Sequence, residues 1–137
     1  VEQITCHELT HAFMAHLKLP SWLNEGLAMV TTERFAAKPV VRQDSLALIG
    51  QRAEFKGSLS LQAAKLDGLE AAVALYATGY WRTRYLEETQ PGLLKTQLAR
   101  PRPPKSWDSA IAAACNADVD SLWAAVDAAV LAHFGGR

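Results

Sequence analysis

Residues 7–11 read His-Glu-Leu-Thr-His, and residues 22–28 read Trp-Leu-Asn-Glu-Gly-Leu-Ala. On a helix, two histidines four positions apart lie on one face, so both imidazoles can reach one metal ion while Glu8 lies beside it. A catalytic zinc takes three protein ligands and keeps a fourth position for water, which a neighbouring carboxylate can deprotonate. The pattern therefore predicts zinc ligands at His7 and His11 and a general base at Glu8.

The third zinc ligand is predicted to be Glu25. Thirteen residues lie between it and His11, which is enough for one helix to end and an antiparallel helix to begin, so that Glu25 faces back toward the histidines. In metzincin peptidases the third ligand is instead a histidine six residues after the second one, with a glycine three residues after it, but Met14 and Leu17 occupy those positions here. His16 is one residue short and would point to another part of the helix. A carboxylate ligand is therefore favoured.

The two segments resemble the gluzincin clan of zinc peptidases, which includes thermolysin-like enzymes and zinc aminopeptidases. Residues 22–28 are closely similar to the third-ligand segment of the aminopeptidases, whereas the spacing from His11 to Glu25 is nearer to that of the compact bacterial peptidases of the clan called MA-like. The close match covers residues 6–29. The resemblance implies one bound zinc ion, hydrolysis of peptide bonds in a peptide or protein substrate, and, for bacterial members, an extracytoplasmic location.

In gluzincins a sheet subdomain precedes the motif helix, and the edge strand of that sheet holds the peptide substrate. Val1 lies only six positions before His7, which leaves no room for such a subdomain. On this resemblance we expect residues 1–137 to form a single helical metallopeptidase domain. We expect it to be the C-terminal part of a longer protein, whose N-terminal remainder would be its partner.

The resemblance also points to a donor for the oxyanion. In MA-like peptidases a tyrosine at the start of a long helix, followed by alanine, reaches over the zinc, and Tyr76-Ala77 resembles that pattern. A phenol keeps its proton at neutral pH, so it can donate to the oxyanion opposite the zinc. Tyr80, one turn further on, is the substitute donor, and a place in the core is the alternative role for Tyr76. Glu33 is a candidate partner for a ligand histidine, with a solvated carboxylate as its alternative.

The composition is that of a globular domain. Half of the 137 residues are apolar, which is enough for a core, and 14 Lys and Arg residues balance 14 Asp and Glu residues. A neutral chain has no overall field that would favour nucleic acid or an anionic membrane, and no apolar run reaches the roughly 18 residues of a membrane span. The two cysteines, Cys6 and Cys115, are too few for a disulfide framework, and Cys6 is expected to be a small buried hydrophobe.

Apolar periodicity predicts an all-α fold, a compact bundle of about six or seven helices. The expected helices run from near the start to Lys18, then over residues 22–35, 44–55, 69–89, 93–99, 107–115 and 119–134. Their expected core stripes are Cys6, Leu9, Phe13 and Leu17 on the first helix, Leu69, Val73, Tyr76 and Tyr80 on the long one, and Val119, Leu122, Trp123, Val126, Val130 and Phe134 on the last. Arg82 and Arg84 are expected mostly outside the stripe. Gly79 predicts a close helix crossing, and Gly26 a close approach of backbone beside the metal.

A non-enzymatic role is the alternative for the same residues. A helical domain can keep a structural zinc, or an empty site, and serve as a docking surface in a larger protein. A fourth protein ligand, with His16 or Cys6 as the expected donor, would favour this role, because a catalytic zinc keeps one position open. A chain that binds no metal, with ordinary helices in place of a zinc site, is the third alternative.

Overall fold

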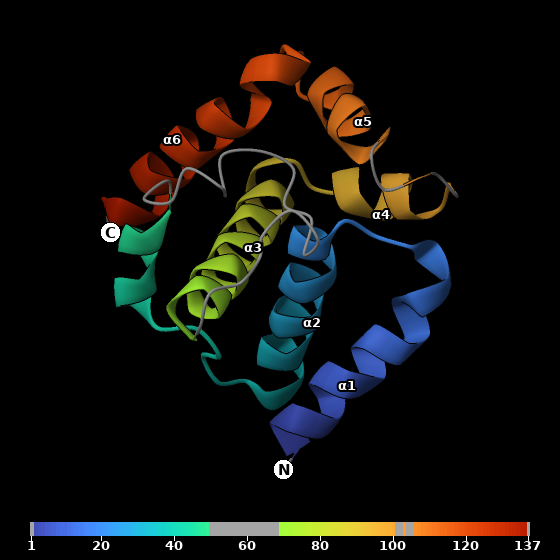
Figure 1. Ribbon diagram of the computed structural model, residues 1–137, viewed down its shortest axis with the longest axis vertical. Helices are drawn as coiled ribbons and strands as arrows, with labels where there is room; N and C mark the ends of the chain where they lie inside the picture. The colour runs from blue at the N-terminus through green and yellow to red at the C-terminus, as the bar shows by residue number, and fades with distance from the viewer. Residues whose placement is uncertain (1, 50–68, 101–102, 104–105, 137) are drawn as a thin grey trace.

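The protein is built from helices. The computed structural model describes residues 2–49, 69–100, 103 and 106–136, and within these ranges it contains no strand and no helix long and apolar enough to span a membrane. The α-helices are α1 (Glu2–Met14), α2 (Ser21–Ala36), α3 (Leu69–Thr89), α4 (Leu93–Leu98), α5 (Trp107–Ala114) and α6 (Leu122–Gly135). The 3-10 helices are η1 (Ala15–Leu17), η2 (Gln43–Leu48) and η5 (Val119–Ser121). The prediction of an all-α fold with about six or seven helices is confirmed (Figure 1).

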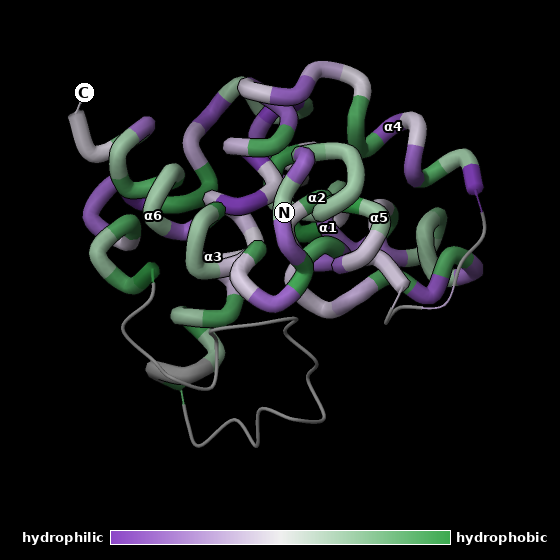
Figure 2. The backbone as a smooth tube through the Cα atoms, turned by 90° about the horizontal axis from the view of Figure 1, so that it is seen from above, coloured by the Kyte–Doolittle hydropathy of each residue, from purple (hydrophilic) through white to green (hydrophobic). Residues whose placement is uncertain are grey.

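Helices α2 and α3 form the centre of the fold. α1 packs on α2, and η2 and α6 pack against α3 (Figure 1). Hydrophilic and hydrophobic residues alternate along the helices (Figure 2), and the apolar sides meet in one core. Tryptophans supply much of this core. Trp22, Trp81 and Trp107 are fully buried, and Trp22 packs edge to face against Trp123 with ring centroids 4.7 Å apart.

The helix boundaries agree closely with the sequence expectations, because they depend on local signals. The long helix α3 begins at Leu69 and ends at Thr89, as predicted. The motif helix ends in η1, after which Lys18 adopts a left-handed conformation with φ of 51°. The helix expected over 44–55 is a 3-10 helix that ends at Leu48, and its continuation beyond residue 49 lies outside the described residues.

Two glycines let α2 and α3 cross at close range. A Cβ atom added at Gly79 would lie 2.4 Å from the carbonyl oxygen of Trp22, and one added at Gly26 would lie 2.3 Å from the carbonyl oxygen of Gly79. Both distances are far below van der Waals contact, so only glycine fits at either position. The predicted crossing at Gly79 is confirmed. The close backbone approach at Gly26 is an approach to α3, rather than to the metal site as expected, because α2 packs on that helix.

Gly79→Ala is expected to destabilise the fold, because the new methyl group must push the two helices apart. Overpacking of this kind costs about 1–3 kcal/mol of unfolding free energy. Gly135→Ala, near the end of α6, is the matched control, since a Cβ atom there would meet only a Leu46 methyl group at 3.9 Å. Urea unfolding measures both variants. Equal unfolding midpoints for the two would contradict the close crossing.

Arg82 lies outside the predicted apolar stripe, as expected, but the side of α3 that carries it is buried. Its side chain is fully buried, with Nε 2.7 Å from Oδ1 and Nη2 2.8 Å from Oδ2 of Asp127 on α6. The guanidinium also lies over the ring of Trp123, 4.4 Å from its centroid. A bidentate carboxylate and an aromatic face together compensate the charge in the core. Arg82 therefore joins α3 to α6 instead of facing solvent.

Two of the expected core stripes are also wrong in part. On α1, Leu9 is 52% and Phe13 is 76% exposed, and with Cys6 and Phe35 they line an open groove between α1 and α2. Cys6 is only partly buried, so it is not the core hydrophobe that was expected. The reason is that α1 lies at the edge of the described fold and packs mainly on α2 (Figure 1), so one apolar side of this helix is only partly covered.

The first half of the α3 stripe is exposed as well. Leu69 is 79% exposed, and Val73 and Tyr76 are 44% and 43% exposed, whereas Tyr80 is buried. Helical periodicity selects one side of a helix but does not tell whether another element covers it. On the last helix the predicted stripe is buried from Leu122 to Phe134, and only Val119, in η5, is exposed.

Candidate metal centre

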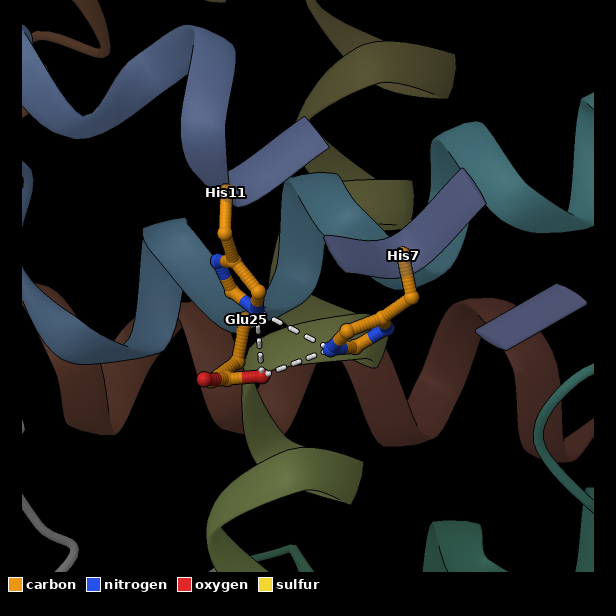
Figure 3. Close-up of side chains that lie close together, drawn as sticks. All are labelled: His7, His11 and Glu25. Atoms are coloured by element: carbon orange, nitrogen blue, oxygen red, sulfur yellow. Dashed lines mark hydrogen bonds and ion pairs between the residues drawn. The ribbon is translucent and has the colours of Figure 1, made fainter. Parts of the chain in front are cut away.

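His7 and His11 on α1 and Glu25 on α2 converge on one point (Figure 3). The Nε2 atoms of the two histidines lie 2.9 Å apart, and each is 3.3 Å from Oε2 of Glu25. All three side chains are partly buried. Within the described part of the chain, this is the one group of three or more His, Cys, Asp and Glu side chains close enough to hold a metal ion. The three residues that the sequence predicts as ligands are therefore the ones that meet.

The triangle has the size of a tetrahedral zinc site. Ligand atoms about 2.0–2.1 Å from a tetrahedral ion lie roughly 3.3 Å from one another. The two distances from histidine to Glu25 equal that spacing, and the 2.9 Å between the histidines is shorter than it by about 0.4 Å. A slight separation of the two rings therefore makes room for the ion.

The hydrogen bonds within the site satisfy the two histidines but not the carboxylate, because the two Nε2 atoms lie within hydrogen-bond distance of each other at 2.9 Å. Nδ1 of His11 donates a hydrogen bond to Oδ1 of Asn24 at 3.1 Å, so Nε2 is the ring nitrogen that faces the other two ligand atoms. Oε2 of Glu25 is buried and accepts no hydrogen bond from the described residues. A buried carboxylate oxygen without a hydrogen bond is unfavourable unless a cation lies beside it. The donor set fits a zinc ion on this ground.

Asn24 is a site residue that the sequence analysis missed. By fixing the ring orientation and tautomer of His11, it has the role that amides, carbonyls and carboxylates have behind metal-bound histidines. The available signal was its position, directly before Glu25 in the segment Asn-Glu-Gly. The first turn of α2 holds both residues firmly, because Trp22 and Leu23 are fully buried there and the backbone N–H of Asn24 donates to the Pro20 carbonyl at 2.9 Å.

Glu8 is exposed and lines, together with the ligand His7, a cavity of about 280 Å³, which we call the metal-side cavity. Its walls are Gln3, Ile4, His7, Glu8, Thr32 and Val40. A carboxylate in this position is open to solvent and to a substrate. A general base must lie within hydrogen-bond reach of the water that it deprotonates, and the role of Glu8 as that base stays a prediction.

Tyr76 is not a core residue, so the alternative role for it was wrong. Its side chain is exposed, its hydroxyl has no hydrogen-bond partner among the described residues, and it lines a second cavity between α2, η2 and α3. That cavity shares Val40 with the metal-side cavity. The role of Tyr76 as oxyanion donor stays a prediction.

Tyr80 and Glu33 belong to a separate network. The Tyr80 hydroxyl lies 2.9 and 2.8 Å from the two carboxylate oxygens of Glu33 and accepts a hydrogen bond from Nη1 of Arg84 at 3.2 Å. Burial, together with the hydrogen bond to Glu33, raises the pKa of Tyr80 to about 12, although Arg84 acts in the opposite direction. Tyr80 therefore donates to Glu33 at neutral pH and is not free to serve as the substitute oxyanion donor.

The same network corrects the expectations for Glu33. Its carboxylate binds Tyr80 and also accepts from the backbone N–H of Val40 at 3.2 Å. It is therefore neither a partner of a ligand histidine nor a freely solvated carboxylate. The two candidate fourth ligands, His16 and Cys6, are not part of the ligand group either, since His16 lies exposed on η1 and Cys6 lines the groove between α1 and α2.

The chain matches no family model, no curated protein and no solved structure.

Proposed function

We propose that this protein is a zinc-dependent peptidase in which His7, His11 and Glu25 hold one zinc ion and Glu8 is the general base. The observation that carries the proposal is the triangle of three ligand atoms, 2.9 to 3.3 Å on a side, with a second carboxylate, Glu8, in the adjoining cavity. The resemblance of residues 6–29 to gluzincin peptidases directs the proposal to peptide bonds rather than to other substrates.

Each residue has a defined part in this reaction. A bound zinc would supply a Lewis acid that acidifies water and polarises the scissile carbonyl. Glu8 accepts a proton from the attacking water and passes it to the leaving amine. Asn24 keeps the His11 ring in the tautomer that presents Nε2 to the ion. The Tyr76 hydroxyl donates to the oxyanion that develops on the attacked carbonyl.

The test of this function is metal analysis combined with cleavage of a quenched fluorescent peptide library by the purified full-length protein. We expect one zinc per chain, cleavage that is lost on removal of the metal by a chelator, and recovery on addition of zinc. Zinc bound in stoichiometric amount with no peptide cleaved would favour the non-enzymatic module. If the protein holds no zinc after it has been refolded in the presence of zinc, the metal site itself is overturned.

Tyr76→Phe separates the proposed role of the phenol from a merely structural one. Because the ring stays and only the exposed hydroxyl is lost, the unfolding free energy should change by less than about 1 kcal/mol. Turnover should fall on the order of a hundredfold, as it does when one oxyanion donor is removed, with little change in KM. Paired thermal unfolding and single-turnover kinetics measure the two effects.

Tyr85→Phe is the matched control for this variant. It makes the same change further along α3, where Tyr85 packs edge to face on His133 with centroids 5.7 Å apart, and it should keep parental turnover. Full activity of Tyr76→Phe would leave zinc alone as the stabiliser of the oxyanion, because the Tyr80 hydroxyl is bound to Glu33 and Arg84.

A further inference from the structure

A cavity of about 500 Å³ lies between α2, η2 and the first half of α3, and we call it the apolar cavity. Most of its wall is aliphatic or aromatic, from Met29, Val41, Leu48, Val73, Tyr76 and Ala77. We propose that it holds a large aliphatic or aromatic side chain of the peptide substrate, close to the bond that is cut. This inference rests on the proposed function and names its substrate class.

The apolar cavity adjoins the metal-side cavity. Val40 lines both of them, and so separates the space beside His7 and Glu8 from the apolar cavity by a single residue. A peptide whose backbone passes Glu8 can therefore place a side chain beyond Val40. The groove between α1 and α2, which is also apolar, has no wall residue in common with the metal-side cavity and does not have this relation to the site.

The shared wall is held in place by the network around Glu33. The N–H of Val40 donates to Oε2 of Glu33 at 3.2 Å, and the same carboxylate accepts from the buried Tyr80 hydroxyl. Glu33 thus ties the segment after α2 to α3. Binding sites need walls that are largely formed before the ligand arrives. This network keeps the boundary between the two cavities in place without a ligand.

The charges at the apolar cavity cancel. The only charged residues in its wall are Arg42 and Asp44, whose side chains bind each other with Nη2 2.9 Å from Oδ2 and Nε 3.2 Å from Oδ1. Ser45, the remaining polar residue, donates to the Arg42 carbonyl at 2.6 Å and accepts from Nε1 of Trp81 at 3.0 Å. No wall residue therefore offers an unpaired charge to a substrate side chain. The volume lies within the roughly 300–1,000 Å³ of ligand sites, so an aromatic ring has room.

The first arm of the test uses the full-length zinc enzyme. Peptides that differ only in one residue near the scissile bond (Phe, Leu, Gly or Asp) are compared by kcat/KM, with each flanking position scanned in turn. We expect a preference for Phe and Leu over Gly and Asp of tenfold or more at one position, the range that apolar pockets give. Val73→Asp, which places a charge in the cavity wall, should reduce that preference about tenfold. Leu131→Asp is the control, because Leu131 on α6 is 40% exposed, close to the 44% of Val73, and lines neither cavity.

The second arm needs neither metal nor activity. The chain contains two methionines, Met14 and Met29, and only Met29 lines the apolar cavity. In metal-free protein labelled with ¹³C at the methionine methyl groups, N-acetyl-phenylalanine amide should shift the Met29 signal saturably and leave Met14 unchanged. N-acetyl-aspartate amide should shift neither signal, and Val73→Asp should weaken the effect on Met29.

The two arms distinguish the inference from the function on which it rests. Peptide cleavage without a side-chain preference, or with a preference that Val73→Asp leaves intact, overturns the inference and leaves the peptidase in place. Absence of any cleavage together with a saturable Met29 shift overturns the peptidase and identifies the cavity as a site for apolar ligands of another kind. No shift of Met29, or equal shifts of both methionines, overturns the cavity as a binding site.

Discussion

Replacing His11 with alanine is expected to remove most of the zinc from the protein. His11 supplies one of three ligand atoms, and its Nε2 lies 2.9 Å from that of His7 and 3.3 Å from Oε2 of Glu25. Two protein ligands are too few to retain zinc, because catalytic zinc sites use three. Elemental analysis of purified His11→Ala protein, with the zinc content expressed per chain, measures the effect. Retention of one zinc per chain would show that the ligand set is wrong.

Two further variants serve as references for the zinc binding of His11→Ala. His16→Ala removes an exposed histidine of η1 that is outside the ligand group, and it should keep a full zinc content. Asn24→Ala leaves the three ligands intact and removes only the hydrogen bond to His11, so zinc affinity should fall by about 10–100-fold rather than disappear. A competition titration with a chromophoric chelator ranks the three proteins. An Asn24→Ala affinity equal to the parental one would remove Asn24 from the site.

How much of the fold could be predicted from the sequence depends on how far apart along the chain the interacting residues lie. The bounds of α3 and the end of α1 at η1 depend on nearby residues, and the sequence predicted both. The burial of Arg82 depends on Asp127, 45 positions further along the chain, and no pattern in the sequence near Arg82 indicates that partner. The exposure of Leu9 and Phe13 similarly depends on which elements cover α1. Periodicity therefore defined the helices but not their neighbours.

The same distinction holds within the candidate site. The approach of His7 to His11 is fixed by one helical turn, and the approach of Glu25 needs only a neighbouring helix, so three ligand atoms in contact could be expected from spacing alone. The role of Asn24 is apparent only from the structure, in which the His11 ring is oriented toward its side chain. Tyr80 and Glu33 lie 47 positions apart, and their pairing, which excludes both from the roles considered for them, is set by the packing of α2 on α3.

Glu8→Gln is expected to keep the zinc and lose hydrolysis. Glutamine has the shape of glutamate, but its amide oxygen cannot take a proton from water at neutral pH, so the step that generates the nucleophile loses its base. General base catalysis contributes about 10²–10⁴-fold to the rate, and we expect a loss of that order in kcat. Because Glu8 is exposed, the unfolding free energy should change by no more than about 0.5 kcal/mol, the usual limit for surface substitutions.

The design of this experiment separates the base from the ligands and from the fold. Zinc content, thermal unfolding and single-turnover cleavage are measured on the same preparation of full-length protein, so that a loss of rate cannot arise from a loss of metal. Glu88→Gln makes the same chemical change on α3, where the carboxylate pairs with Arg84 at 2.8 Å, and it should cleave peptides at the parental rate. Near-parental cleavage by zinc-loaded Glu8→Gln would exclude Glu8 as the base. A water activated by zinc alone, with a proton acceptor other than Glu8, would then have to explain the activity.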